Sequence, residues 1–188
     1  MLNKSIFLLA VLLLSSGSIA LAESSGKVVI SETVTCADQA LQLNGYGDRK
    51  KFFIKLYVAS LYTQEKIDDE SQLLKMQQAL CMRLNITSSK NTSEKMINAT
   101  REGFEKSTKG NIAPIETEVN AFLSWLEQPI KKGDVFEFAF IPHNNTQVSK
   151  NGAVLGNIEN KDFSAALYGI WLGDMPAQQD LKAKLLGK

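Results

Sequence analysis

Arg49 is the side chain in this sequence that is best suited to hold an anion. It follows a glycine-rich segment, residues 44–48, whose composition resembles a phosphate-binding loop. Such loops lead into a helix, and the N–H groups at the start of that helix bind the phosphate. The residues after Arg49 predict a strand instead, so the glycines indicate a tight turn with positive φ. Arg49 is left as a candidate for charge-assisted hydrogen bonds to an acidic ligand.

Lys55 and Tyr57 are the second candidates for a ligand site. We predict a strand over residues 49–62 that runs through Phe52 and Phe53, with Lys55 and Tyr57 on the same face as Arg49. At about 3.3 Å per residue, Tyr57 would lie more than roughly 20 Å from Arg49 in a straight strand. A site that contains all three side chains therefore requires a bulge or a long ligand.

The two cysteines, Cys36 and Cys81, allow a disulfide if the chain folds in an oxidising compartment. Sequence alone does not show that their Cα atoms approach closely enough, so two free thiols are the alternative. A catalytic cysteine is not predicted, because the single histidine, His143, lies beside Pro142 and an Asn-Asn turn. One histidine also disfavours a metal site. The residues indicate no metal and no cofactor.

The first 22 residues have the organisation of a secretory signal peptide. Lys4 supplies a basic start, residues 6–14 form an unbroken apolar run, and Ala20-Leu21-Ala22 is a small-x-small cleavage site. The apolar run is shorter than the about 20 residues that a membrane-spanning helix needs. We predict a signal peptide at residues 1–22, a periplasmic or secreted mature chain, and no membrane span after cleavage.

Length and charge indicate one neutral domain over residues 23–188. The whole chain has 21 basic and 20 acidic residues, and removal of the signal peptide takes away only Lys4. A neutral chain lacks the basic face that nucleic acids require. The length is that of a single domain with a sizeable core. Oligomeric state and protein partners are not indicated.

The hydrophobic periodicity predicts strands, then helices, then strands, then helices. Neighbouring strands are mostly joined by turns, among them a hairpin at Asn151-Gly152, so we expect a largely antiparallel sheet with helices on one face, an α+β fold. The predicted strands are residues 27–35, 39–43, 49–62, 80–86, 134–141, 146–150 and 153–158. The predicted helices are residues 73–78, one capped by Asn91 with Glu94, one that starts near Pro114, 163–171 and 181–186.

Two blocks of the sequence stand out. The first is Asn44-Gly-x-Gly-x-Arg49 followed by Lys55-x-Tyr57-Val58-x-x-Leu61-Tyr62. The second is Ala166-Leu167-Tyr168-Gly169-Ile170-Trp171-Leu172-Gly173-Asp174-x-Pro176. Together these blocks resemble the chalcone isomerase-like family, and more closely its exported bacterial branch. The resemblance implies an open-faced β-sandwich, in which a large antiparallel sheet is covered by a layer of helices, with a ligand cleft between them.

The resemblance also implies two kinds of activity. The plant enzymes of this family close a chalcone into a flavanone, and the arginine that Arg49 matches holds the phenolate and the developing enolate. Non-enzymatic members bind fatty acids, and there the same arginine meets the carboxylate. Most other catalytic groups are not matched: Tyr57 replaces a threonine, Thr92 replaces a tyrosine, Asn98 is one position out of step, and Ile170 replaces a small hydroxyl residue.

Three hypotheses follow from the residues and the resemblance. In the first, the chain binds a small apolar, fatty-acid-like acid, with Arg49 as its anchor. In the second, it is an intramolecular lyase of the chalcone isomerase type. In the third, the domain is structural, Arg49 pairs with Asp48 or Asp174, and the cleft is filled. Trp171 has helical spacing and is predicted to be a core residue in all three.

Overall fold

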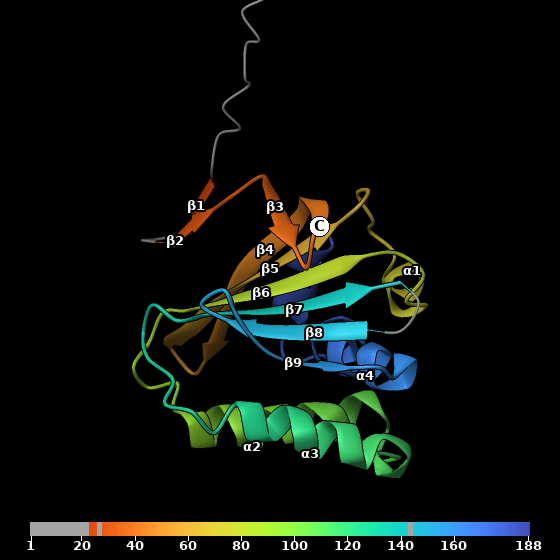
Figure 1. Ribbon diagram of the computed structural model, residues 1–188. Helices are drawn as coiled ribbons and strands as arrows, with labels where there is room; N and C mark the ends of the chain where they lie inside the picture. The colour runs from red at the N-terminus through yellow and green to blue at the C-terminus, as the bar shows by residue number, and fades with distance from the viewer. Residues whose placement is uncertain (1–22, 26–27, 143–144) are drawn as a thin grey trace, which may run out of the picture.

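The sheet of the computed structural model is antiparallel throughout. The structure describes residues 23–25, 28–142 and 145–188, so the predicted signal peptide at residues 1–22 and His143 lie outside the described residues. Seven strands are hydrogen-bonded in the order β3-β4-β5-β6-β7-β8-β9, and β1 pairs with β2 apart from them (Figure 1). The strands are β1 Glu23–Ser25, β2 Val28–Ile30, β3 Thr33–Cys36, β4 Gln39–Lys51, β5 Ile54–Thr63, β6 Leu80–Ile86, β7 Val135–Ile141, β8 Asn145–Lys150 and β9 Ala153–Ile158.

Helices cover one face of this sheet (Figure 1). They are α1 Glu70–Leu74, α2 Ser93–Ser107, α3 Glu116–Trp125, α4 Lys161–Leu172 and α5 Gln179–Leu185, with a 3₁₀ turn at Ala113–Ile115 before α3. The predicted α+β class and antiparallel sheet are therefore confirmed. Among the described residues, no helix combines the length and apolar character that a membrane crossing requires.

Helix α4 lies between the sheet and α2. The Tyr168 hydroxyl donates to the carbonyl oxygens of Leu80, at 3.0 Å, and Phe138, at 2.7 Å, on two neighbouring strands. On its other side, α4 places Ile170 against Gly103 of α2, where an added Cβ would come within 2.8 Å of the Ile170 side chain. Helices α2 and α4 are thus packed together without room for another side chain at this crossing.

The core between sheet and helices is rich in aromatic rings. Phe136, Phe138 and Phe140 of β7 are all buried, as their alternation predicts. The Phe138 ring stacks on that of Trp171 with ring centroids 6.0 Å apart. The ring centroids of Phe104 and Phe163 lie 5.4 Å apart. Such pairs stabilise by about 0.5–1.5 kcal/mol beyond the area they bury. The prediction of Trp171 as a core residue is confirmed.

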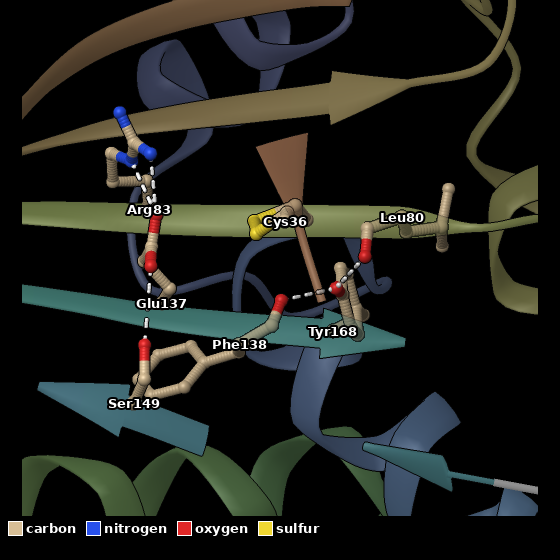
Figure 2. The surroundings of a disulfide bond; sticks show 8 residues. Cys36, Leu80, Arg83, Glu137, Phe138, Ser149 and Tyr168 are labelled. Atoms are coloured by element: carbon tan, nitrogen blue, oxygen red, sulfur yellow. Dashed lines mark hydrogen bonds and ion pairs between the residues drawn. A yellow bond between two sulfur atoms is a disulfide. The ribbon is translucent and has the colours of Figure 1, made fainter. Parts of the chain in front are cut away.

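The opposite face of the sheet carries a second, smaller cluster. It includes Ile30, Leu41, Val58 and Tyr62. A disulfide joins Cys36, at the end of β3, to Cys81 of β6, and their Cα atoms lie 6.3 Å apart. Strands β4 and β5 lie between β3 and β6 in the sheet, so the disulfide fixes the end of β3 over the face of β6. Figure 2 shows the segment of Cys36 passing in front of β6.

The structure corrects the predicted turn at residues 44–48 and the predicted strand through Phe52. Strand β4 continues through the glycines without positive φ, and the chain reverses at Phe52, whose φ is 54°. The glycines are needed for close approach: a Cβ at Gly45 would overlap the carbonyl oxygens of Lys184 and Leu185 in α5. Residues 49–62 are therefore two strands of a hairpin rather than one strand.

Other boundaries differ by a few residues. The strand predicted at 27–35 is divided into β2 and β3, and the helix predicted at 73–78 is α1, which starts after Asp69 and ends before Met76 takes φ of 50°. Thr92 rather than Asn91 caps α2, accepting from the Lys95 amide at 3.4 Å. The hairpin at Asn151-Gly152 is confirmed, with φ of 53° and 80°.

Candidate functional site

Arg49 and Tyr57 are direct cross-strand partners. The turn at Phe52 folds β5 back along β4, so that Arg49 pairs with Tyr57 in the antiparallel register. Side chains that oppose each other in this way share a face and have Cβ atoms about 5 Å apart. The predicted separation of more than roughly 20 Å is therefore wrong, because it assumed one straight strand.

Tyr57 is buried and is held from the helix layer. Its hydroxyl oxygen accepts a hydrogen bond from Nε1 of Trp171 at 3.0 Å. Burial raises the pKa of Tyr57 above its ordinary value, and the Trp171 N–H and the nearby Arg49 charge offset this rise only in part. Tyr57 is thus a neutral phenol at physiological pH. Among the hydrogen bonds of the described residues, none uses its hydroxyl hydrogen, which can be donated to a ligand.

Arg49 is half-buried, and its hydrogen-bond partners are neutral. Its Nη1 donates to the carbonyl oxygen of Lys50 and, at 3.2 Å, to Oε1 of Gln178. Gln178 immediately precedes α5. Its Oε1 also accepts from the Lys50 amide at 2.8 Å, and its Nε2 donates to the Asp48 carbonyl oxygen at 3.1 Å. The amide of Gln178 therefore holds the end of β4 and orients the guanidinium.

In the ion pairs of the described residues, Arg49 differs from the other two arginines of the chain in having no carboxylate partner. Arg83 forms an ion pair with Glu137, and Arg101 forms one with Glu116 at 3.2 Å. Asp48 is paired with Lys55 at 2.7 Å, and Asp174 with Lys109 at 2.9 Å. Among the described residues, no ion pair includes Arg49. The two acids expected as its partners, Asp48 and Asp174, are thus each paired with a lysine, and the Arg49 guanidinium can bind an external acid.

Lys55 does not share this face, so the prediction that it does is wrong. The register passes from Arg49–Tyr57 to Lys50–Lys55, which leaves Leu56 as an extra residue of β5, a β-bulge. The Lys55 ammonium instead meets Asp48, which lies opposite Val58 of the second cluster. The bulge separates Lys55 from Arg49 and Tyr57.

On the outer face, Glu137 is held by Arg83 and Ser149 from the two strands beside its own (Figure 2). Arg83 donates from Nε to Glu137 Oε1 at 2.9 Å, and Ser149 donates to Glu137 Oε2 at 3.1 Å. A carboxylate oxygen of Glu137 and the sulfur atoms of Cys36 and Cys81 lie within 4.8 Å of one another. These sulfurs are joined in a disulfide, so they are not the thiolates that a metal requires. This cluster therefore has a structural role.

Two hollows of the surface lie away from Arg49. One, of about 300 Å³, lies between the end of α2 and α4 and is lined by Lys106, Ser107 and Gly169 among others. The second, of about 360 Å³, is lined by Asn44, Lys66 and Gly187 among others. Neither is lined by Arg49, Lys55 or Tyr57, so neither hollow is a site built on these three side chains.

The remaining positions that the resemblance matched do not supply catalytic groups. Thr92 is exposed and caps α2, and Asn98 is exposed on the same helix. Ile170 is buried against Gly103 and brings no polar atom. Sequence reasoning missed Gln178, because nothing in its local sequence distinguishes it from a surface glutamine. It also missed the hydrogen bond of Trp171, which was predicted only as a core residue.

Comparison with known proteins gives a family, a relative and a fold. A family model described as chalcone isomerase-like matches residues 22–187. Fatty-acid-binding protein 2 of Arabidopsis thaliana is 26% identical over 96 residues, which span 47% of this chain and only 24% of that protein. The crystal structure of another Arabidopsis thaliana fatty-acid binding protein, AtFAP1, matches with a TM-score of 0.74 and 15% identity, over 88% of this chain and 96% of that one. This last likeness is one of fold.

Proposed function

This chain belongs to the chalcone isomerase-like family, and from that premise we propose that it is a non-catalytic binding protein for a small apolar acid, such as a fatty acid. The observation that carries the proposal is Arg49, a half-buried guanidinium with neutral partners beside the Tyr57 hydroxyl. The names of the two Arabidopsis proteins support the ligand class. The poorly matched catalytic set favours binding over turnover.

The chemistry of this pair suits a carboxylate. A guanidinium can donate two parallel hydrogen bonds to a carboxylate, and lysine cannot reproduce that geometry. The raised pKa of Tyr57 keeps its hydroxyl protonated, so the phenol adds a donor and no negative charge. Because Trp171 occupies the Tyr57 oxygen from the helix side, the hydroxyl hydrogen is directed elsewhere.

The apolar part of the ligand would enter the space between sheet and helices. Apolar side chains lie there next to Tyr57, since Trp171, whose indole donates to the Tyr57 oxygen, stacks on Phe138 of β7. Burial of the ligand's apolar surface there would supply most of the affinity. Because Trp171 of α4 stacks on Phe138 of β7, entry between sheet and helices requires these side chains or α4 to shift.

The test is displacement of a fluorescent fatty acid from the wild type, Arg49→Lys, Arg49→Met and a control, Arg101→Met. A hydrogen bond to a charged group contributes about 1.5–3 kcal/mol, so we expect Arg49→Met to lose roughly tenfold to a hundredfold in affinity and Arg49→Lys somewhat less. Arg101 is a partly exposed arginine on α2 that is paired with Glu116, and its loss should leave binding unchanged. Equal affinity in all four proteins, each with its melting temperature checked, would refute the proposal.

Export of the mature chain is also part of the proposal. It is supported by the signal-peptide organisation of residues 1–22 and by the buried cysteine pair, since disulfides persist in oxidising compartments. N-terminal sequencing of the mature protein should begin at Glu23, in the periplasmic or secreted fraction. Recovery of Met1 from the mature protein would contradict export.

A further inference from the structure

The tip of the β4–β5 hairpin exposes two consecutive phenylalanines. Phe52 and Phe53 have side-chain exposures of 87% and 102%, and the next residue, Ile54, is 44% exposed. The other large apolar residues exposed in the described part of the chain, Val29, Val154 and Met175, are each isolated in the sequence. Single exposed apolar residues are ordinary, whereas a contiguous group at the end of a projecting hairpin marks an interaction site.

The fold does not account for these aromatic residues. Phe52 takes φ of 54°, a left-handed conformation that is unfavourable for a residue with a bulky side chain and natural for glycine or asparagine. Neither phenylalanine ring is among the aromatic contacts of the core. A turn selected for stability alone would therefore carry other residues.

The charges around the tip are basic. Residues 49–55 contain Arg49, Lys50, Lys51 and Lys55 and no acidic residue. Lys50 and Lys51 are exposed, while Lys55 is paired with Asp48. Glu102 of α2 interacts electrostatically with Lys51. Its carboxylate is already paired with Lys106 at 2.6 Å. Two exposed lysines thus stand directly behind the aromatic tip.

We propose that the Phe52–Phe53 tip docks the protein on an anionic lipid surface. Aromatic rings favour the boundary between headgroups and acyl chains, and lysines behind them can extend their ammonium groups to lipid phosphates. Charge complementarity selects an anionic bilayer over a neutral one. Arg49 is only three residues from Phe52, so docking places the proposed acid-binding site beside the headgroups. This last consequence rests on the proposed function, whereas the docking itself does not.

The experiment is flotation of the protein with vesicles of phosphatidylcholine, alone or mixed with phosphatidylglycerol, in the absence of any fatty acid. All variants carry the same N-terminus, so that any contribution of residues 6–14 is equal in all of them. We compare the wild type with Phe52→Ser/Phe53→Ser and with Lys50→Gln/Lys51→Gln. The control, Val154→Ser/Met175→Ser, removes two exposed apolar residues from other places.

The wild type should bind the anionic vesicles more tightly than the neutral ones. Loss of both phenylalanines should weaken that binding by at least about tenfold, and loss of both lysines by about fivefold for each charge. The control should bind as the wild type does. Absence of wild-type binding to either vesicle, or equal binding by the phenylalanine variant, would overturn the proposal. The proposal would also be overturned if the wild type were a dimer in sedimentation equilibrium and Phe52→Ser/Phe53→Ser dissociated that dimer without changing vesicle binding.

Because no fatty acid is present, this result does not depend on the proposed function. Arg49→Met is included in the same flotation experiment. It should remain vesicle-bound, because both phenylalanines of the tip and both exposed lysines are intact in it. Failure of acid binding with retained flotation would refute only the proposed function. Failure of flotation with retained acid binding would refute only the docking.

Discussion

The Tyr57 hydroxyl and the Trp171 indole are joined by a hydrogen bond of 3.0 Å between β5 and α4. Tyr57 belongs to the first sequence block that resembles the family, and Trp171 belongs to the second. The bond therefore connects the two blocks across the sheet–helix interface, next to Arg49. It also fixes one side of the Tyr57 oxygen, which leaves the hydroxyl hydrogen for a ligand.

Trp171→Phe should destabilise the fold through this bond. The substitution keeps an aromatic ring against Phe138 but leaves the buried Tyr57 oxygen without its donor. An unsatisfied buried polar group costs about 1–3 kcal/mol, which urea unfolding would measure. Trp125→Phe is the matched control, because the Trp125 N–H is in none of the hydrogen bonds of the described residues. Equal losses in the two variants would show that the hydrogen bond contributes nothing beyond ring size.

Stability should fall at alkaline pH because of buried tyrosines. Burial raises the pKa of Tyr57, Tyr62 and Tyr168 above the ordinary value of 10.0. A pKa that is higher in the folded state means that the native protein keeps protons which the unfolded chain loses. The stabilisation is therefore complete below about pH 10 and is lost as the pH rises above it.

Urea unfolding measured across that range tests this expectation. The free energy of unfolding should decrease with pH above about 10, and Tyr57→Phe should make the decrease shallower. Tyrosinate absorbance of the folded protein provides the second readout, since the three buried residues should ionise at higher pH than tyrosines of the unfolded chain. Ionisation of these residues in the folded protein at or below the ordinary pKa of 10.0 would contradict the direction of the shifts.

The sequence predicted the elements whose residues alternate and missed those that depend on distant contacts. Strands β6 and β7 were predictable, because Leu84 and Phe136 and their neighbours bury every second side chain. The hairpin turn was not, because Phe52 and Phe53 continue an apolar pattern and carry none of the usual turn residues. Gly45 resembles a turn residue, yet its small size serves contact with α5, about 140 residues later in the chain.

The same distinction applies to the site. Arg49 and Tyr57 were identified from the sequence because they stand in blocks that resemble a family. Their adjacency was not, because it depends on the unrecognised turn at Phe52. Lys55 was placed on the wrong face because the bulge at Leu56 leaves no mark in the sequence. Gln178 reaches Arg49 only because α5 docks on β4.

Reduction should destabilise the protein measurably. The disulfide joins cysteines 45 residues apart in the sequence, and such a bond typically stabilises by about 2–4 kcal/mol. We expect a reductant to lower the urea midpoint of the wild type and to leave Cys36→Ser/Cys81→Ser unaffected. Thiol labelling of the unfolded, unreduced protein should find no free thiol. Two labelled thiols would mean that the bond is absent from the protein.

No useful turnover of a chalcone is expected. Arg49 can stabilise a phenolate, but positioning the substrate and delivering a proton require further groups. Ile170, which by the resemblance replaces a small hydroxyl residue, brings no polar atom, and both Thr92, which caps α2, and Asn98 on α2 are exposed. The assay is cyclisation of a chalcone with and without protein. A rate well above the spontaneous one that Arg49→Ala abolishes would instead support the lyase hypothesis.

Gln178→Ala should weaken acid binding without a comparable loss of stability. Its side chain lies outside the core, but its amide joins Arg49, the Lys50 N–H and the Asp48 carbonyl oxygen. Without it, the guanidinium loses a partner that orients it towards a carboxylate. A hydrogen bond of this kind contributes about 0.5–1.5 kcal/mol, so affinity for the fluorescent fatty acid should fall by about threefold to tenfold. Gln42→Ala is the control, since Gln42 is also on β4 and its side chain donates to the Gln64 carbonyl oxygen, at 2.9 Å, away from Arg49. If Gln178→Ala binds as tightly as Gln42→Ala, the docking of α5 does not prepare Arg49 for its ligand.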